Sequence, residues 1–256
     1  MPPNNPQPWR LEVSRLNRLT QQGAYRYNEL LHESRSFLSR RFPTALWQGD
    51  PAQPTVALTF DDGPSQRDLG RILASLDAAG AVATFFFIGE KVPAAPQLVR
   101  EVARAGHQIG LHGYRHRPFT STRPELLRAE LLLARTLIGR LCGWCPEQLR
   151  DVRPPYGMFS PATLRALDRW GYRAVMWSLV PFHWQISAPM AHGQIQRRLR
   201  SGSLIVLHED MAHGPPVGDL LDTTLAHIRS AGLRTITIDE MWRSHPRAPS
   251  PLPLAV

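Results

Sequence analysis

The sequence predicts an α/β fold in which a parallel sheet, open or closed into an incomplete (β/α) barrel of about seven strands, follows an N-terminal helical extension. From residue 54 onwards, short runs of β-branched and aromatic residues alternate with segments whose apolar residues recur at helical spacing. Repeated β–α units of this kind form parallel sheets. The length of 256 residues, 43% of them hydrophobic, suits one domain with a short appendage.

The expected strands are short apolar runs, and most of them are followed by a helical segment. Strands are expected at 55–59, 83–88, 107–111, 150–152, 174–177, 204–207 and 235–238. Helices are expected at 68–79, 94–105, 124–139, 161–170, 194–200 and 219–231. The longest helical pattern is 124–139, where six leucines recur at helical spacing. Seven strands in this order fit a slightly incomplete barrel.

Two terminal regions differ from this pattern. Residues 9–42 place apolar side chains at roughly helical spacing among seven arginines, with a break near Gly23, so we expect one or two amphipathic helices packed on the main domain. The last residues are rich in proline and are expected to be disordered. The chain therefore divides into a helical extension at 1–50, a main domain at 51–242 and a tail at 243–256.

The charge of the chain is strongly positive, with a formal value of +9 and an estimated pI of 10.6. Of the 30 basic residues, Lys91 is the only lysine. Residues 1–50 carry +3 and residues 241–256 carry +2, which leaves +4 for the rest. No basic cluster interleaved with aromatic residues is present, so we expect no specific nucleic-acid partner. The hypothesis that the protein is a nucleic-acid or membrane-surface adaptor is supported by its net charge alone.

Targeting signals and cysteines add few constraints. No apolar run reaches the roughly 18–20 residues of a membrane helix, and the N-terminus lacks a basic segment followed by an apolar core. As written, the chain is expected to be cytoplasmic, without a transmembrane segment, and its oligomeric state stays open. Cys142 and Cys145 are best interpreted as small residues in a turn, ahead of a local disulfide. A redox motif would need a thioredoxin-like sequence around the two cysteines, and a zinc ribbon would need a second cysteine pair; the sequence has neither.

Acidic, basic and imidazole side chains follow the ends of several expected strands. The clusters are Asp61-Asp62, His112 with His116, Arg153, His183-Trp184 and His208-Glu209-Asp210. Sites in parallel α/β folds lie at the carboxyl ends of strands, where these clusters would converge. Taken singly, each has an ordinary structural interpretation, such as a turn, a polar loop or a hydrogen-bonded core histidine. Five such clusters in order favour a common site.

The residue types indicate metal-assisted hydrolysis. Asp62, His112 and His116 would form a two-histidine, one-carboxylate site with open positions, which suits zinc or another divalent transition metal. Adjacent carboxylates diverge, so Asp61 stays free to act as a base. The metal would lower the pKa of a water molecule and polarise a carbonyl group, and a separate acid would complete the reaction.

Four ordered motifs resemble those of the polysaccharide deacetylases with a NodB homology domain, carbohydrate esterase family 4. They are TFDDGP at 59–64, HGYRH at 112–116, RPPYG at 153–157 and VLHED at 206–210, within a resemblance that covers roughly residues 54–242. The resemblance implies a distorted (β/α) barrel. It also implies removal of acetyl groups from N-acetylated sugars of chitin or peptidoglycan, or of O-acetyl groups from xylan.

The resemblance further implies a role for each matching residue. Asp61 would be the general base, and Arg153 would hold and orient it. His208 would be the general acid, and the backbone N–H of Tyr156 would help to stabilise the oxyanion. Three groups complete the site: metal ligands Asp62, His112 and His116; pocket residues Pro155, Trp184 and Leu207; and one divalent ion, usually Zn²⁺, sometimes Co²⁺ or Ni²⁺. The implied mechanism is attack of activated water on the amide carbonyl through a tetrahedral intermediate.

The chain departs from the family pattern at three positions. Gly113 stands where Ser or Thr is usual, His183-Trp184 lacks the usual carboxylate of the fourth motif, and Glu209 stands where Asp is usual. Without that carboxylate, we expect His208 to be less readily protonated, because nearby negative charge favours the imidazolium form. The departure at His183 is therefore expected to alter the protonation of the general acid, His208.

The leading hypothesis is a metal-dependent hydrolase that deacetylates an N-acetylated sugar polymer or oligomer. An O-acetyl, xylan-type esterase is the alternative, because a leaving alkoxide needs the acid less than a leaving amine does. A third hypothesis is a weakly active, carbohydrate-binding relative of these enzymes. The presence of both Asp61 and His208, the implied base and acid, disfavours it. Because such enzymes usually act on the cell envelope, an envelope association is the alternative to the cytoplasmic location.

Overall fold

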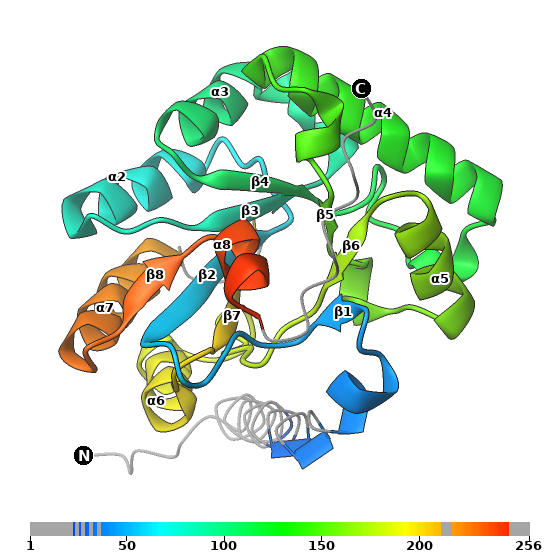
Figure 1. Ribbon diagram of the computed structural model, residues 1–256. Coiled ribbons are helices and arrows are strands. Elements are labelled where there is room, and N and C mark those ends of the chain that lie inside the picture. Colours follow the sequence, from blue (N-terminus) through cyan, green and yellow to red (C-terminus); the bar gives the residue numbers. More distant parts are fainter. Residues whose placement is uncertain are drawn as a thin grey trace, which may run out of the picture.

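Parallel strands form a half-barrel surrounded by helices, as the sequence predicts (Figure 1). The computed structural model describes residues 37–210 and 217–245, together with Gly23, Arg26, Glu29, Leu30, Glu33 and Ser34. The strands are β1 (Ala45–Leu46), β2 (Thr55–Asp61), β3 (Thr84–Phe87), β4 (Gln108–Leu111), β5 (Asp151–Val152), β6 (Arg173–Val175), β7 (Leu204–His208) and β8 (Arg234–Ile236). The helices are α2 (Leu69–Ala79), α3 (Pro96–Arg104), α4 (Pro124–Cys142), α5 (Pro161–Arg169), α6 (Ala188–Arg198), α7 (Val217–Ser230) and α8 (Ile238–Ser244).

The strand order is β1-β6-β5-β4-β3-β2-β7, and every pairing in it is parallel. β8 pairs with the first residues of β2, and β7 pairs with the rest. Beyond β6, an isolated parallel bridge joins Leu179 to Ile205 of β7. Parallel pairing places the carboxyl ends of all these strands at one end of the barrel, where the site residues are expected.

All seven expected strands are present, and the differences lie at short elements. β1 lies within the expected N-terminal extension, yet it pairs with β6. The sequence pattern predicts neither β1, which has two residues, nor α8, whose first residue falls within the expected strand at 235–238. Thr237 ends that strand early, because its side chain and that of Glu240 cap the first turn of α8. Helix α6 begins six residues before its expected start.

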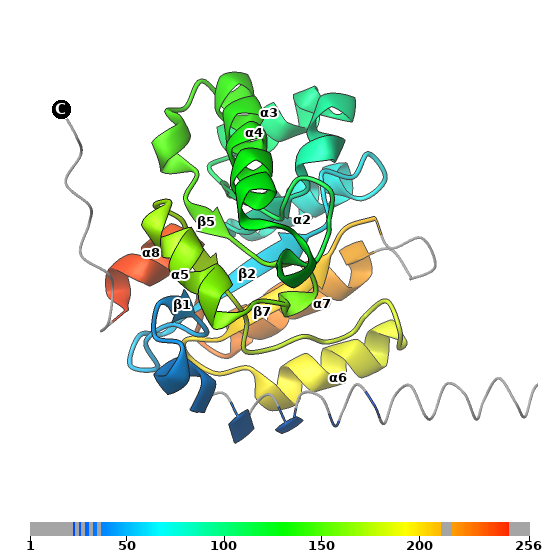
Figure 2. The same ribbon diagram turned by 90° about the vertical axis from the view of Figure 1, so that its right-hand side faces the viewer.

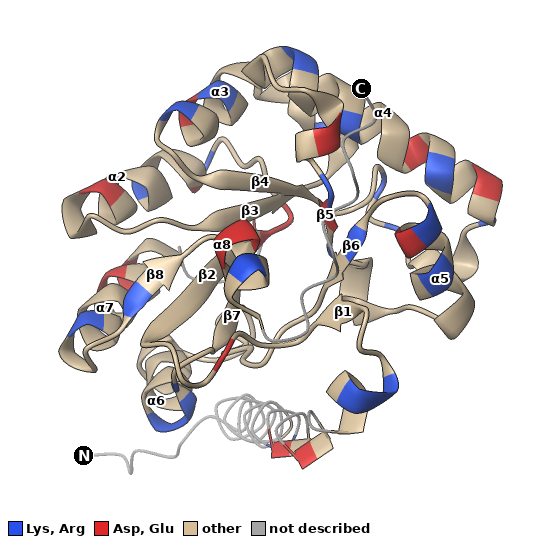
Figure 3. Ribbon diagram, viewed as in Figure 1, with Lys and Arg blue, Asp and Glu red and all other residues tan. Residues whose placement is uncertain are grey.

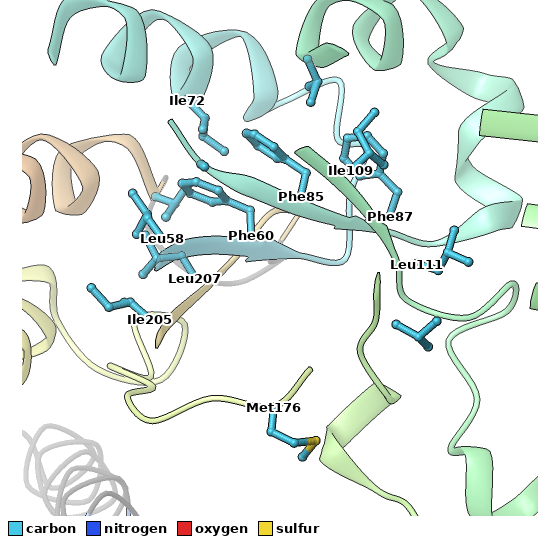
Figure 4. Close-up of a cluster of buried hydrophobic side chains, with 14 of the residues drawn as sticks. Leu58, Phe60, Ile72, Phe85, Phe87, Ile109, Leu111, Met176, Ile205 and Leu207 are labelled. Atoms are coloured by element: carbon cyan, nitrogen blue, oxygen red, sulfur yellow. The ribbon is translucent and has the colours of Figure 1, made fainter. Parts of the chain in front are cut away.

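Strand residues alternate between two apolar layers. Phe85 and Phe87 of β3 face the outer helices, as do Phe60 of β2 and Leu207 of β7, and all four belong to one buried cluster. Within this cluster, Phe60 and Phe85 lie nearest to Ile72 of α2 (Figure 4). The intervening residues form a second layer inside the barrel. Because successive side chains on a strand point to opposite faces, one position decides whether a residue meets the helices or the interior.

Helix α8 closes the amino end of the barrel. Its Asp239 N–H donates to Gln108 Oε1 at 2.8 Å, and Trp242 Nε1 donates to Asp151 Oδ1 at 3.0 Å. Arg173 pairs with both Asp151 and Asp239. In Figure 2, α8 and the loops that follow the strands lie at opposite ends of the barrel. The carboxyl ends of the strands are therefore left for the site.

The terminal regions are only partly described. The expected helices of 9–42 fall mostly outside the described residues, although 37–41 are helical and Phe42 meets Phe159 edge-on at 5.1 Å. Of the expected tail, residues 246–256 lie outside the described chain. Cys142 ends α4, and it and Cys145 are free thiols.

Charged residues are spread over the outer helices, where basic and acidic positions are interleaved (Figure 3). An example is the ion pair of Arg71 on α2 with Asp222 on α7. Among the described residues, no helix is both long enough and apolar enough to cross a membrane.

Candidate metal centre and active site

Four of the expected site residues lie on the interior face of the barrel, at its carboxyl end. Asp61 is the last residue of β2 and is paired in register with His208, the last residue of β7. His112 follows β4, and Arg153 follows β5. The alternation along each strand assigns these residues to the interior, since Phe60, Leu111, Val152 and Leu207 face the helices. The sheet therefore brings together residues that are far apart in the sequence.

Asp62, His112 and His116 form a compact group of metal-ligand atoms. Oδ1 of Asp62 lies 3.4 Å from Nε2 of His112 and 3.1 Å from Nε2 of His116. The three ligand atoms all lie within 4.8 Å of one another. Asp62 and His116 adopt left-handed backbone conformations, with φ values of 71° and 49°. Such conformations are unfavourable for residues other than glycine, and they cluster at functional sites.

The hydrogen bonding of His112 fits a cation at this position. Its Nδ1 donates to the carbonyl oxygen of Arg153 at 2.9 Å, so in the neutral ring Nε2 carries a lone pair. That lone pair faces the carboxylate of Asp62, and two electron-pair donors face each other stably only with a cation or proton between them. A backbone carbonyl behind a ligating histidine is the usual support for a metal site.

The charges of this group reinforce one another. Burial raises the pKa of Asp62, but hydrogen bonds from His112 and His116 outweigh it and lower that pKa well below its usual range. Burial lowers the pKa of His112, but the carboxylates of Asp61 and Asp62 outweigh it and raise the pKa. The group therefore holds an ionised carboxylate beside imidazoles, which is the donor set of a divalent transition metal.

Arg153 holds Asp61 in one orientation. Both side chains are buried, and Arg153 Nη1 lies 2.6 Å from Asp61 Oδ1. The same guanidinium donates to Thr59 Oγ1 at 2.8 Å and to the Met176 carbonyl at 3.0 Å. It also lies over the ring of Phe86, 4.1 Å from the centroid. Because Arg153 occupies Oδ1 of Asp61, the other carboxylate oxygen, Oδ2, faces His112 and lies 3.9 Å from its Nε2.

Within the described part of the chain, no carboxylate is hydrogen-bonded to the ring of His208. Trp184 meets it edge-on, with 4.2 Å between ring centroids, and His183 Nε2 accepts the backbone N–H of His208 at 3.0 Å. Nδ1 of His208 has no hydrogen-bond partner among the described residues. Burial lowers the pKa of His208, despite an opposing effect of Asp61 and Asp62. Burial also lowers the pKa of His183, to about 3, so His183 is neutral.

The loop after β5 covers the metal-ligand group. Tyr156, with a φ of 59°, places its ring 4.7 Å from that of His116 and is 64% exposed. Pro155 is buried beside Gly113. Gly113 has a φ of 75°, which explains the glycine at this departure from the family pattern, because side chains disfavour that conformation.

The expectation that Leu207 borders the site is wrong. Leu207 is fully buried in the layer between the sheet and the outer helices, beside Phe60 (Figure 4). Its neighbour Val206 lies in the interior layer, against which Trp184 packs. Val206 is two positions before His208, so strand alternation could have identified it from the sequence. Trp184 lies beside His208.

Two contacts near Asp62 were not expected. Lys91 Nζ donates to the Asp62 carbonyl at 2.8 Å and pairs with Asp210 Oδ2 at 2.9 Å. Glu209 is fully buried; its Oε2 accepts the Ser65 N–H at 2.9 Å, and burial raises its pKa to about 8. The Glu209 carboxyl group fills the space that a side chain at Gly63 would need. The sequence signalled these residues only as a unique lysine and an unusual glutamate.

Several known proteins with similar sequences or folds are named deacetylases. A family model described as polysaccharide deacetylase matches residues 48–175. A peptidoglycan N-acetylglucosamine deacetylase of Bacillus cereus is 30% identical over 191 residues, covering 74% of this chain and 68% of the relative. A chitooligosaccharide deacetylase of Bradyrhizobium is 30% identical over 185 residues, covering 72% and 81%. The crystal structure of a peptidoglycan N-acetylglucosamine deacetylase superposes with a TM-score of 0.76 at 27% identity, covering 81% of this chain and 96% of the other.

Proposed function

Because the chain belongs to the polysaccharide deacetylase family, we propose that it hydrolyses the acetamido groups of a peptidoglycan- or chitin-like polymer or oligomer. The observation that carries this proposal is the register of the two central strands. It sets Asp61 opposite His208, and Asp62 with its two histidines lies directly beside them. A base and an acid from neighbouring strands thus flank one candidate metal centre, as amide hydrolysis requires.

Asp62, His112 and His116 would hold the metal. Two imidazoles and one carboxylate suit zinc, with cobalt or nickel as substitutes of similar preference. When bound, such a cation supplies Lewis-acid chemistry: it lowers the pKa of water and polarises a carbonyl group. The Nδ1 bond of His112 to the Arg153 carbonyl fixes the ring with Nε2 towards the centre. Three protein ligands leave positions for water and for a substrate oxygen.

Asp61 would act as the general base. Arg153 engages Oδ1, so Oδ2 is the oxygen that would accept a proton from the attacking water. The fixed orientation matters because proton transfer needs the base within hydrogen-bond reach of the water. The backbone N–H of Tyr156 would stabilise the oxyanion that forms at the former carbonyl oxygen.

His208 would act as the general acid. Collapse of the tetrahedral intermediate breaks the C–N bond, and the leaving sugar nitrogen takes the proton from the His208 ring. Trp184 restricts this ring from one side, and the hydrogen bond from the His208 backbone N–H to His183 Nε2 fixes the main chain. The products are acetate and a free amino sugar. Val206 and Trp184 would border the acetyl methyl group, as both lie at the interior layer near His208.

An O-acetyl esterase is the second candidate, and the missing carboxylate partner of His208 favours it. A leaving alkoxide needs less assistance from an acid than a leaving amine does. Acetate release from chitooligosaccharides, peptidoglycan fragments and acetylxylan, measured side by side at equal acetyl concentration, separates the two. The proposal expects the N-acetylated substrates to give the larger kcat/KM. A larger kcat/KM on acetylxylan would assign the esterase activity instead.

A further inference from the structure

Lys91 is the only lysine of a chain with 30 basic residues, and it lies beside the candidate metal centre. It is the third residue of a short 3-10 helix, Gly89–Ala94, that follows β3. Its side chain is 32% exposed, so the ammonium group lies at the boundary between the site and solvent. Lys91 is not the proposed base, the proposed acid or one of the metal ligands. Its position beside the site therefore needs a separate explanation.

The ammonium group joins three loops. It donates to the backbone carbonyl of Asp62, at 2.8 Å, and it pairs with Asp210 Oδ2 at 2.9 Å. Asp62 follows β2, Asp210 follows β7, and Lys91 itself follows β3. Because β3 and β7 are the two neighbours of β2 at its carboxyl end, these loops are adjacent. One side chain therefore ties the loop that carries a metal ligand to the loops on both sides.

The contact acts on a backbone that needs support. Asp62 has a φ of 71°, and Asp210 has a φ of 56°. Residues other than glycine persist in this conformation only where the surroundings over-determine it. The bond to the Asp62 carbonyl fixes the peptide unit immediately after the Asp62 Cα, on the opposite side of the residue from β2. The orientation of the Asp62 carboxylate towards His112 and His116 depends on that peptide unit.

The chemistry of the contact suits lysine better than arginine. A carbonyl oxygen and a carboxylate oxygen approach the same nitrogen from different directions, and an ammonium group offers three rotatable donors on one atom. The donors of a guanidinium lie in one plane and on separate nitrogen atoms, so it could serve both acceptors only if they lay close to that plane. Every other basic residue of the chain is an arginine, so the lysine at this position is an exception to the composition as a whole.

We propose that Lys91 is a positioning residue for the metal centre: it holds the backbone of Asp62 so that the carboxylate reaches His112 and His116. This inference rests on the proposed function, since it assumes that Asp62 binds a metal. It predicts that the loss of Lys91 weakens metal binding more than substrate binding, because the bond to the Asp62 carbonyl acts on the backbone of a metal ligand.

The test compares Lys91→Met and Lys91→Arg with the wild type and with the matched control Arg71→Met. The control removes an exposed ion pair between α2 and α7, away from the site. Competition with a chromophoric chelator gives the dissociation constant for Zn²⁺, thermal unfolding gives the Tm of the metal-free protein, and acetate release gives kcat and KM.

We expect Lys91→Met to raise the dissociation constant for Zn²⁺ about 10–100-fold, the usual effect of removing a group that supports a ligand. At saturating Zn²⁺, kcat should fall while KM stays within about twofold. Lys91→Arg should restore only part of the affinity, and Arg71→Met should bind Zn²⁺ as the wild type does. The Tm of metal-free Lys91→Met should fall no further than that of Arg71→Met, since exposed ion pairs add little stability.

Zn²⁺ binding by Lys91→Met that equals the wild type would overturn the inference. So would an affinity loss of the same size in Arg71→Met, because general destabilisation would then explain both. The proposed function fails separately: if wild-type protein releases no acetate but Lys91→Met still binds Zn²⁺ more weakly, the positioning role stands and the reaction is wrong.

Discussion

The Arg153 guanidinium forms a hydrogen-bonded ion pair with Asp61, with both side chains buried inside the barrel. Thr59 and Met176 accept its remaining hydrogen bonds, so the charge is compensated on several sides. A buried pair of this kind is costly to break, because the partner that remains is an unpaired charge in a poor solvent. This relationship links the stability of the domain to the state of its proposed base.

Arg153→Met should therefore destabilise the protein by about 3–5 kcal/mol, measured by urea unfolding. In this variant the Asp61 carboxylate would remain buried, but it would have lost the positively charged Arg153 side chain as its partner. The control is Arg153→Met combined with Asp61→Asn, in which the buried negative charge is also absent and part of the stability should return. Equal stabilities of wild type and Arg153→Met would mean that the pair contributes no net stability.

The pH profile should respond to a carboxylate placed beside His208. A general acid works while it is protonated, so activity falls as pH rises through its pKa in the enzyme. Burial lowers the pKa of His208, which places this alkaline limb at a lower pH than an unperturbed imidazole would give. His183→Asp adds negative charge near the ring, favours the imidazolium form and should move the limb to higher pH.

His183→Asn is the matched control, because it has the size of the aspartate without its charge. It should leave the alkaline limb of kcat/KM where the wild type has it. An unmoved limb in His183→Asp would indicate that another group donates the proton.

The buried acid Glu209 should make the protein less stable as pH rises. Its pKa is raised by burial from 4.5 to about 8, so between these values the folded state binds a proton that the unfolded state has released. Stability is therefore lost progressively from pH 4.5 to pH 8, by up to about 1.4 kcal/mol per pH unit.

Glu209→Gln should remove this slope, because the amide keeps the acceptor for the Ser65 N–H and does not titrate. Urea unfolding at pH 5.5 and pH 8 measures the difference. Glu209→Ala should be less stable than Glu209→Gln at both values, since it leaves the Ser65 N–H unpaired. A slope in Glu209→Gln equal to that of the wild type would show that other groups cause it.

Leu207→Ala should affect stability and leave the reaction intact. The side chain lies between the sheet and the outer helices, where truncation of a buried leucine costs about 2–5 kcal/mol. KM and kcat of the folded variant, measured well below its Tm, should stay within about twofold of the wild type. A large rise in KM with unchanged stability would return Leu207 to the substrate pocket.

The order of strands and the position of the site could be predicted from the sequence, because parallel strands place their carboxyl ends together. The pattern predicted that the clusters with Asp61 and His208 converge on one site, and the register sets these two residues opposite each other. The side of a strand on which a residue lies is also set by the sequence. Counting back two residues from His208 would have selected Val206 over Leu207.

The remaining features depend on contacts that no local pattern encodes. β1 is a strand only because β6 offers an edge to pair with. The role of Lys91 depends on the left-handed backbone of Asp62 and on the adjacency of three loops. Glu209 is buried because Gly63 leaves room for its carboxyl group. Each of these requires the tertiary structure.

Acetate release from an N-acetylated chitooligosaccharide or peptidoglycan fragment by wild-type protein and by Asp61→Asn, with and without chelator, tests the central claim most directly. The wild type should lose activity in chelator and regain it with Zn²⁺. Asp61→Asn should bind Zn²⁺ yet be about 10²–10⁴-fold slower, since it lacks the base. Acetate release that neither the chelator nor Asp61→Asn reduces would contradict the mechanism.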